Sequence, residues 1–245
     1  VAAGARGIRY NASRPPDERY PSLEALIAAA QDDKDHSAER TYSLRDLKVV
    51  VGHYPSPNPA IPISTRPEHQ RSVMLESPKG IASFTHYSFG QLARTVGAPA
   101  GYLRELPPAL AAEALNFGLQ EATPAGTEAN LLVRANGGSP VLRACTSETY
   151  GRLWDANLSG EVNRHFGDGI RSATGQWMSP PTWSGESAGQ YRGDRDSFII
   201  RVDGGSIVTD PSLTNSTVRT RSTGGTDDQM YRGIMIRNSE VGHCS

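Results

Sequence analysis

A β-hairpin signal in residues 130–146 constrains the fold more than any other part of the chain. Two runs of strand-forming residues, LLVRA and VLRAC, flank an Asn-Gly-Gly turn at residues 136–138. Asn and Gly tolerate the positive φ values that tight hairpin turns require. Side chains alternate across a strand, so a two-residue loop would give the hairpin one apolar face. That face would comprise Leu131, Val133, Leu142 and Ala144.

The opposite face of the hairpin would carry Arg134 and Arg143. A three-residue loop would change the pairing, so this assignment depends on the loop. After the hairpin, apolar residues recur at helical spacing in residues 153–166. We expect this helix to pack on the apolar face of the hairpin, with Arg152 and Arg164 away from its apolar stripe.

Three short helices are predicted before the hairpin. Ser88 is the expected N-cap of the first, residues 89–96, and Gly97 is its stop. Pro99 lies near the start of the second, and Pro107 and Pro108 begin the third. The apolar stripe of the third helix would comprise Leu110, Ala114, Leu115 and Leu119.

The spacing LARTVGAPAGYL within these helices also fits a helix-turn-helix. In that alternative, the second helix would enter the major groove of duplex DNA and offer Arg104 to base edges. The segment is short for a recognition helix, and any two short helices joined by Gly meet the pattern.

The rest of the chain suggests three parts. Residues 1–20 form a basic arm, residues 21–84 an N-terminal part without a clear pattern, and residues 85–245 the main domain. Residues 196–202 and 231–237 read as strands, with long polar loops before each. We therefore predict an α+β fold in which a small antiparallel sheet, built on the central hairpin, is packed by helices and carries long irregular loops.

Composition limits the possible functions. The 245 residues carry a net charge of −1, which argues against a protein that coats nucleic acid by bulk charge. The cations are nevertheless mostly arginine, since only Lys34, Lys48 and Lys79 are lysines among 25 cationic side chains. No apolar run is long enough to span a membrane, so a cytoplasmic protein is expected. Cys145 and Cys244 lie outside any CxxC pattern and suggest neither a disulfide framework nor a zinc site.

Motifs for catalysis and cofactor binding do not occur. The chain has no GxxxxGK[ST], GxGxxG, HExxH or GxSxG sequence. No cofactor, metal ligand or catalytic residue is therefore nominated, although an enzyme stays possible. A non-catalytic role is the expectation.

Four ordered blocks resemble one protein family. They are SFGQLARTVGAPAGYLRELPPALAAEALNFGL, LRACTSETYGRLWDA, DRDSFIIRVD and YRGIMIRNSEVG, and they span residues 84–242. They look like the phage/plasmid-like family of mobile-element proteins, a domain family of unknown function. The resemblance implies DNA metabolism in a bacterial host, a chain that continues beyond residue 245, and a more distant likeness in fold to phage single-strand annealing proteins.

These observations favour a homo-oligomeric protein that binds and anneals single-stranded DNA without catalysis. Arginines would follow the phosphates and loop aromatics would stack on bases. The nominated residues are Arg134, Arg143, Arg152, Arg164, Arg104, Trp177 and Trp183. Three alternatives remain open, namely a structural or protein-interaction component of a mobile-element assembly, the helix-turn-helix regulator and a metal-dependent nuclease.

Overall fold

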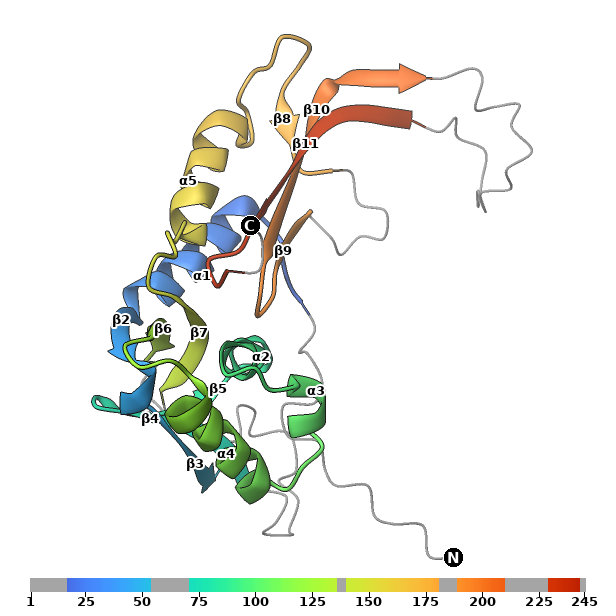
Figure 1. The fold of residues 1–245 in the computed structure, drawn as a ribbon. Coiled ribbons are helices and arrows are strands. Elements are labelled where there is room, and N and C mark those ends of the chain that lie inside the picture. The colour runs from blue at the N-terminus through green and yellow to red at the C-terminus, as the bar shows by residue number, and fades with distance from the viewer. Residues whose placement is uncertain (1–16, 54–70, 136–139, 181–188, 210–228, 243–245) are drawn as a thin grey trace, which may run out of the picture.

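The computed structural model describes residues 17–53, 71–135, 140–180, 189–209 and 229–242. Helices and two open β-sheets form an α+β fold, as predicted (Figure 1). The two sheets lie toward opposite ends of the molecule, and α2 lies between them in this view. No helix in the described ranges is long and apolar enough to cross a membrane.

Sheet B contains the predicted hairpin at its centre. Its order is β2-β6-β7-β5-β4-β3, and every pair is antiparallel except β5 with β7. The strands are β2 (Ser37–Ser43), β3 (Lys48–His53), β4 (Arg71–Ser77), β5 (Gly80–Phe84), β6 (Glu128–Arg134) and β7 (Val141–Ser147). The predicted hairpin is thus extended on both sides by strands from residues 37–84.

A β-bulge changes which hairpin residues share a face. Leu132 pairs with Ala144 and Val133 pairs with Leu142, so Arg143 is the extra residue on β7. Leu142 therefore faces the main core, whereas Ala144 packs on the other side of the sheet. The prediction that these two residues share one face is wrong, because the bulge at Arg143 puts Ala144 on the opposite side of the sheet from Leu142.

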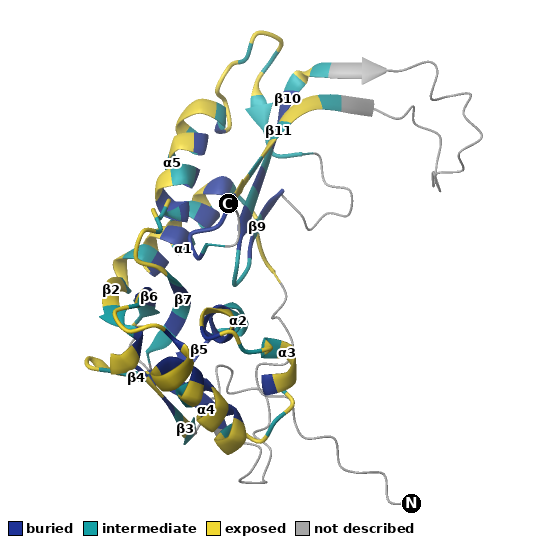
Figure 2. Ribbon diagram, in the orientation of Figure 1, coloured by how far each residue is buried: buried dark blue, intermediate teal, exposed yellow. Residues whose placement is uncertain are grey.

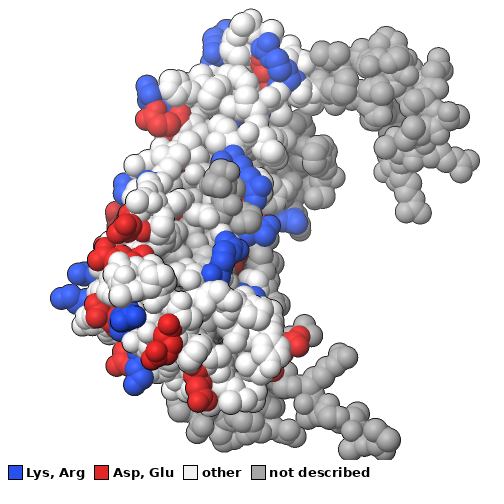
Figure 3. Space-filling model, viewed as in Figure 1, with Lys and Arg blue, Asp and Glu red and all other residues white. Residues whose placement is uncertain are grey.

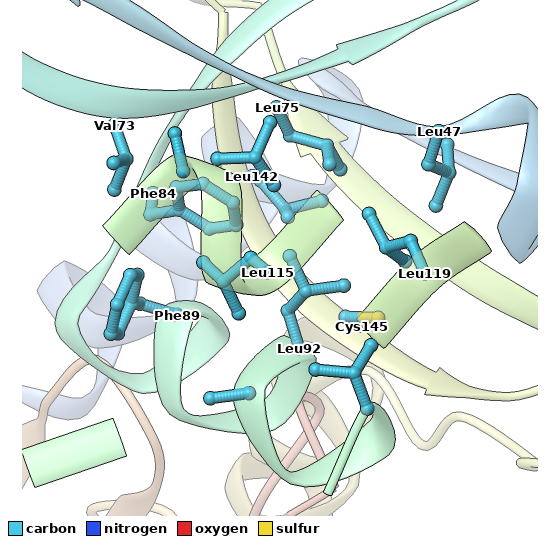
Figure 4. Close-up of a cluster of buried hydrophobic side chains, with 14 of the residues drawn as sticks. Leu47, Val73, Leu75, Phe84, Phe89, Leu92, Leu115, Leu119, Leu142 and Cys145 are labelled. Atoms are coloured by element: carbon cyan, nitrogen blue, oxygen red, sulfur yellow. The ribbon is translucent and has the colours of Figure 1, made fainter. Parts of the chain in front are cut away.

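Three helices cover one face of sheet B and enclose the main core (Figure 4). They are α2 (His86–Thr95), α3 (Ala100–Leu103) and α4 (Pro108–Phe117), the last continued by a π-helical turn (Gly118–Ala122). In the core, the Phe84 and Phe89 rings meet edge to face with centroids 5.7 Å apart. The three predicted helices are thus confirmed, and they serve as scaffold.

Two details of these helices differ from expectation. Thr85, rather than Ser88, is the N-cap of α2, and the two residues form a reciprocal capping box. On α4 the buried positions are Ala111, Ala112 and Leu115, while Leu110 is 52% exposed. Leu115 and Leu119 of the predicted stripe are buried, whereas Ala114 is exposed like Leu110 and the small residues Ala111 and Ala112 are buried instead, where the helix packs on β3 and β4.

Sheet A is a second antiparallel sheet that the sequence did not predict as a unit. Its order is β1-β9-β10-β11, with β8 also paired to β10. The strands are β1 (Glu18–Tyr20), β8 (Trp177–Met178), β9 (Gln190–Arg192), β10 (Ser197–Thr209) and β11 (Gln229–Asn238). Residues from the predicted arm and from the end of the chain therefore share one sheet.

Helices α1 (Leu23–Asp35) and α5 (Asp155–Phe166) pack together on the inner face of sheet A. Leu26, Val162 and Ile199 are buried where the helices meet the sheet. Figure 2 shows that α5 exposes its outer side to solvent. The predicted packing of this helix on the hairpin is therefore wrong, and its apolar stripe is instead covered by α1 and β10.

Candidate nucleic-acid interface

The hairpin arginines predicted to bind phosphates are bonded to carboxylates instead. Arg134 Nη1 lies 2.6 Å from Asp33 Oδ1, and its Nη2 lies 2.8 Å from Asp32 Oδ2. Arg143 Nη2 lies 2.5 Å from Glu240 Oε1. Only 11% of the Arg143 side chain is exposed, so a DNA strand cannot reach it without displacing an ion pair.

Arg192 of β9 lies at the centre of the same buried cluster. Its guanidinium contacts three carboxylates, those of Asp33 on α1, Asp155 on α5 and Glu240 after β11. Asp155 also accepts hydrogen bonds from Ser197 Oγ at 2.7 Å. Each of these residues comes from a different element, so the cluster ties both helices to both sheets.

The charges in the cluster shift one another's pKa values. Burial raises the pKa of Asp155, and repulsion by Glu240 adds to this, while Arg192 opposes it. Burial alone would raise the pKa of Glu240, but attraction by Arg143 and Arg192 lowers it overall. For Arg192, attraction by Glu240, Asp33 and Asp155 outweighs burial, which by itself would lower the pKa, and raises it. The folded protein therefore favours the charged forms of Glu240 and Arg192 and disfavours the charged form of Asp155.

The predicted site residue Arg152 is occupied in a similar way. Its Nη2 lies 2.9 Å from Glu39 Oε1, and its Nη1 donates to the Glu240 carbonyl. The guanidinium also lies over the rings of Tyr150 and Trp154, 5.5 and 5.8 Å from their centroids. With 2% of its side chain exposed, Arg152 belongs to the interior.

The other nominated residues are scattered. Arg164 is exposed on α5 and pairs with Glu161 on the same helix. Trp177 packs edge to face on Phe166, with ring centroids 4.9 Å apart, so it holds β8 against the end of α5. Trp183 lies outside the described residues. The structure therefore does not bring Arg164 or Trp177 together with the hairpin arginines.

Arg104 lines a cleft beside α2 and α3. Its Nη2 donates a 2.7 Å hydrogen bond to the His86 carbonyl, and its guanidinium lies 5.0 Å from the Phe89 ring centroid. The one-turn helix α3 is too short to serve as a recognition helix in a major groove. The helix-turn-helix alternative is thus unsupported by the geometry, although Arg104 itself still borders an open cleft.

The outer face of sheet A carries a row of arginines and aromatics that runs across four strands. Arg19 pairs with Tyr191, Tyr191 with Phe198, and Phe198 with Arg237. Directly opposed residues point to the same side of a sheet, so these four side chains lie side by side. They form the outer row, comprising Arg19, Tyr191, Phe198 and Arg237.

The two arginines of the outer row stack on its two rings. Arg19 lies 5.9 Å from the Tyr191 centroid, and Arg237 lies 5.0 Å from that of Phe198. Arg237 also pairs with Asp196. Both arginines are exposed and both rings are half-buried, whereas the opposite face of the same strands is covered by α1 and α5. The outer row is thus a solvent-facing surface of cations and aromatic rings.

Met235 continues this surface along β11. It pairs with Ile200, the next outward position on β10, and 66% of it is exposed. Figure 3 shows basic side chains over α2 and over the strands of sheet A, and mixed charges toward α4 and β2.

Sequence reasoning missed the outer row because its members come from three distant segments. The period-2 pattern in DSFIIRV and YRGIMIR was visible and predicted two strands. Which residues of those strands face outward depends on α5 covering Ile199 and Ile236, and the pairing of β1 with β9 has no local signal.

Comparison with known proteins yields no relative for this chain: no family model, no curated protein and no solved structure matches it. Within the described ranges, no group of three or more His, Cys, Asp or Glu side chains is placed to hold a metal ion.

Proposed function

We propose that the protein binds single-stranded DNA on the outer face of sheet A and anneals complementary strands without catalysis. The observation that carries the proposal is the outer row itself, in which two adjacent aromatic rings lie between two arginines across one sheet. Single-strand binders combine cations for the backbone with aromatic side chains on which bases stack. The proposed surface replaces the hairpin arginines, because Arg134 and Arg143 are more deeply buried in their ion pairs than Arg237 is in its pair with Asp196.

The proposal also includes three expectations that come from the sequence. We propose that the protein belongs to the phage/plasmid-like family, acts in the bacterial cytoplasm and forms homo-oligomers. Annealing requires that bases stay accessible while phosphates are neutralised. An open sheet face meets this requirement better than an enclosed channel, because a second strand can approach the bound one.

The test is binding of a fluorescently labelled oligothymidylate across a range of salt concentrations. Phe198→Leu keeps an apolar side chain but removes a stacking ring, so affinity should fall about 5- to 100-fold. Arg19→Ala should reduce the salt slope by about 0.7, the value for one phosphate contact on a single strand. Arg164→Ala, which removes an exposed arginine from α5, is the matched control and should bind normally.

Duplex DNA of the same length serves as competitor, and the annealing of complementary strands is followed by fluorescence transfer. Wild-type protein should prefer the single strand and accelerate annealing. Salt-independent binding, or equal affinity of wild type and the Phe198→Leu variant, would sink the proposal.

A second candidate function rests on α4. Leu110 and Phe117 lie seven positions apart on one side of this helix, and they are 52% and 65% exposed. Such a pair favours a protein-interaction role in an assembly. Light scattering should then show oligomers without DNA, and the double variant Leu110→Ser, Phe117→Ser should be monomeric. A wild-type monomer at high concentration would exclude this role for α4.

A further inference from the structure

A cleft of about 600 Å³ lies where α2 turns into α3, apart from the outer row. It falls within the range of roughly 300–1,000 Å³ that is typical of small-molecule sites. Its walls come from the side of α2, the turn and the start of α3. The lining residues include His86, Tyr87, Arg94, Pro99 and Arg104.

Two arginines give the cleft its charge. Within the described part of the chain, no carboxylate lies within the 4.0 Å ion-pair distance of Arg94 or Arg104. Arg94 is exposed on the last turn of α2. Burial lowers the pKa of Arg104, and attraction by Asp194 from a longer distance opposes this shift. The cleft thus differs from the hairpin, where every nominated arginine contacts a carboxylate.

One hydrogen-bond donor of Arg104, its Nε, is unsatisfied among the described residues. Its Nη2 is bonded to the His86 carbonyl, but its buried Nε has no partner among the described residues. A buried unsatisfied donor is costly unless a ligand or water satisfies it. Arg104 is therefore held in place by one bond and by the Phe89 ring while part of its guanidinium remains available.

Two glycines belong to the wall of the cleft, and each has a structural reason to be glycine. A Cβ on Gly90 would lie 3.3 Å from Arg104 Nη2, and Gly97 has a φ of 73°, which disfavours other residues. Both glycines line the cleft. The uncharged part of the lining consists of the Tyr87 ring, Pro99 and small alanines, which suit a sugar or base rather than a second charge.

We infer that this cleft binds a nucleotide, with its phosphate between Arg94 and Arg104 and its organic part against Tyr87 and Pro99. Guanidinium groups match phosphate oxygens in charge and geometry. The nucleotide is either free or the terminal nucleotide of a strand that carries a 5′-phosphate. The inference goes beyond the proposed function, because it concerns a different surface and does not need an extended strand.

Calorimetric titration with thymidine 5′-monophosphate, thymidine and inorganic phosphate tests the inference. The monophosphate should bind at least tenfold more tightly than either thymidine or phosphate alone. Arg94→Ala should lower the affinity for the monophosphate at least fivefold, while Arg94→Lys should retain part of that affinity. Arg94 is preferred to Arg104 as the variant because it is exposed and its loss should leave the fold intact. Arg164→Ala is the control for charge.

Short oligothymidylates with a 5′-phosphate or a 5′-hydroxyl distinguish the two sources. If wild-type protein binds the 5′-phosphorylated oligonucleotide more tightly than the 5′-hydroxyl form, and Arg94→Ala abolishes this preference, the cleft binds strand ends. Equal affinities, together with binding of the monophosphate, would assign it to free nucleotides. No measurable monophosphate binding, or binding that Arg94→Ala leaves unchanged, overturns the inference. The proposed function would survive that result, since Phe198→Leu tests it separately.

Discussion

Arg192 Nη2 lies 2.8 Å from Glu240 Oε1, and both side chains are buried. Arg192 belongs to β9 of sheet A, whereas Glu240 also binds Arg143 of the hairpin in sheet B. The ion pair therefore joins the two sheets through a single carboxylate. It also explains why arginines that looked suited to DNA in the sequence are unavailable to it.

Removal of Arg192 should destabilise the protein strongly. Arg192→Met leaves Asp33, Asp155 and Glu240 close together without their shared cation, and breaking a buried ion pair costs about 3–5 kcal/mol. Urea unfolding measures the loss. The control Arg164→Ala, which breaks only an exposed pair on α5, should cost less than about 1 kcal/mol. Equal effects of the two changes would contradict the central role of Arg192.

Acid should weaken the fold through Glu240. Its pKa is lowered in the folded state, so its stabilisation is complete above the ordinary value of 4.5 and is lost as the pH falls through the folded value. Glu240→Gln should therefore lower the unfolding free energy at pH 7 and flatten its decline on acidification. The measurement is urea unfolding at a series of pH values from 7 downward.

Asp155 should act in the opposite direction. Its pKa is raised in the folded state, so its ionisation costs stability as the pH rises from the ordinary value of 3.8 through the folded value. Asp155→Asn removes this compensating contribution and should make the acid decline steeper than in wild type. A flatter decline in this variant would show that the carboxylate is ionised at a lower pH than its surroundings suggest.

Short stretches of sequence predicted where helices and strands form better than they predicted which of them pack together. The hairpin and the Gly97 stop follow from nearby residues and appear in the structure. The bulge at Arg143 and the packing of α5 on α1 depend on contacts between distant segments, which no short window contains.

The dependence on distant contacts also explains why the carboxylate partners of the hairpin arginines were not predicted. A run such as LLVRA identifies Arg134 as a strand residue, but not the presence of Asp33 beside it. The acids that bind the hairpin arginines lie on α1 and after β11, about 100 positions away in sequence, as the 102-residue separation of Arg134 and Asp32 illustrates. Charge pairing over such distances can be seen only once the topology is known.

The Cys145 thiol should resist modification in the folded protein. It is 3% exposed, and burial raises its pKa to about 12, so almost no reactive thiolate forms at neutral pH. In a Cys244→Ser background, a thiol reagent should label Cys145 only as fast as the protein opens. Mass spectrometry with and without urea gives the two rates. Rapid labelling without urea would show that the hairpin face is accessible.

Gly118 packs closely on Val96, so the effect of Gly118→Ala on the free energy of unfolding should depend on the side chain at position 96. A Cβ on Gly118 would lie 2.6 Å from Val96 Cβ, so one of the two must move. Gly118 has helical φ and ψ of −60° and −42°, and Ala would otherwise gain about 1 kcal/mol there from helix propensity. Overpacking costs about 1–3 kcal/mol, so the overlap should decide the sign and Gly118→Ala should destabilise the protein. In a Val96→Gly background the Val96 Cβ and both methyl groups are absent, so the overlap is removed and the same change should become neutral or stabilising. Urea unfolding of the four proteins gives the coupling energy, and a stabilising Gly118→Ala in both backgrounds would contradict this packing between α2 and α4.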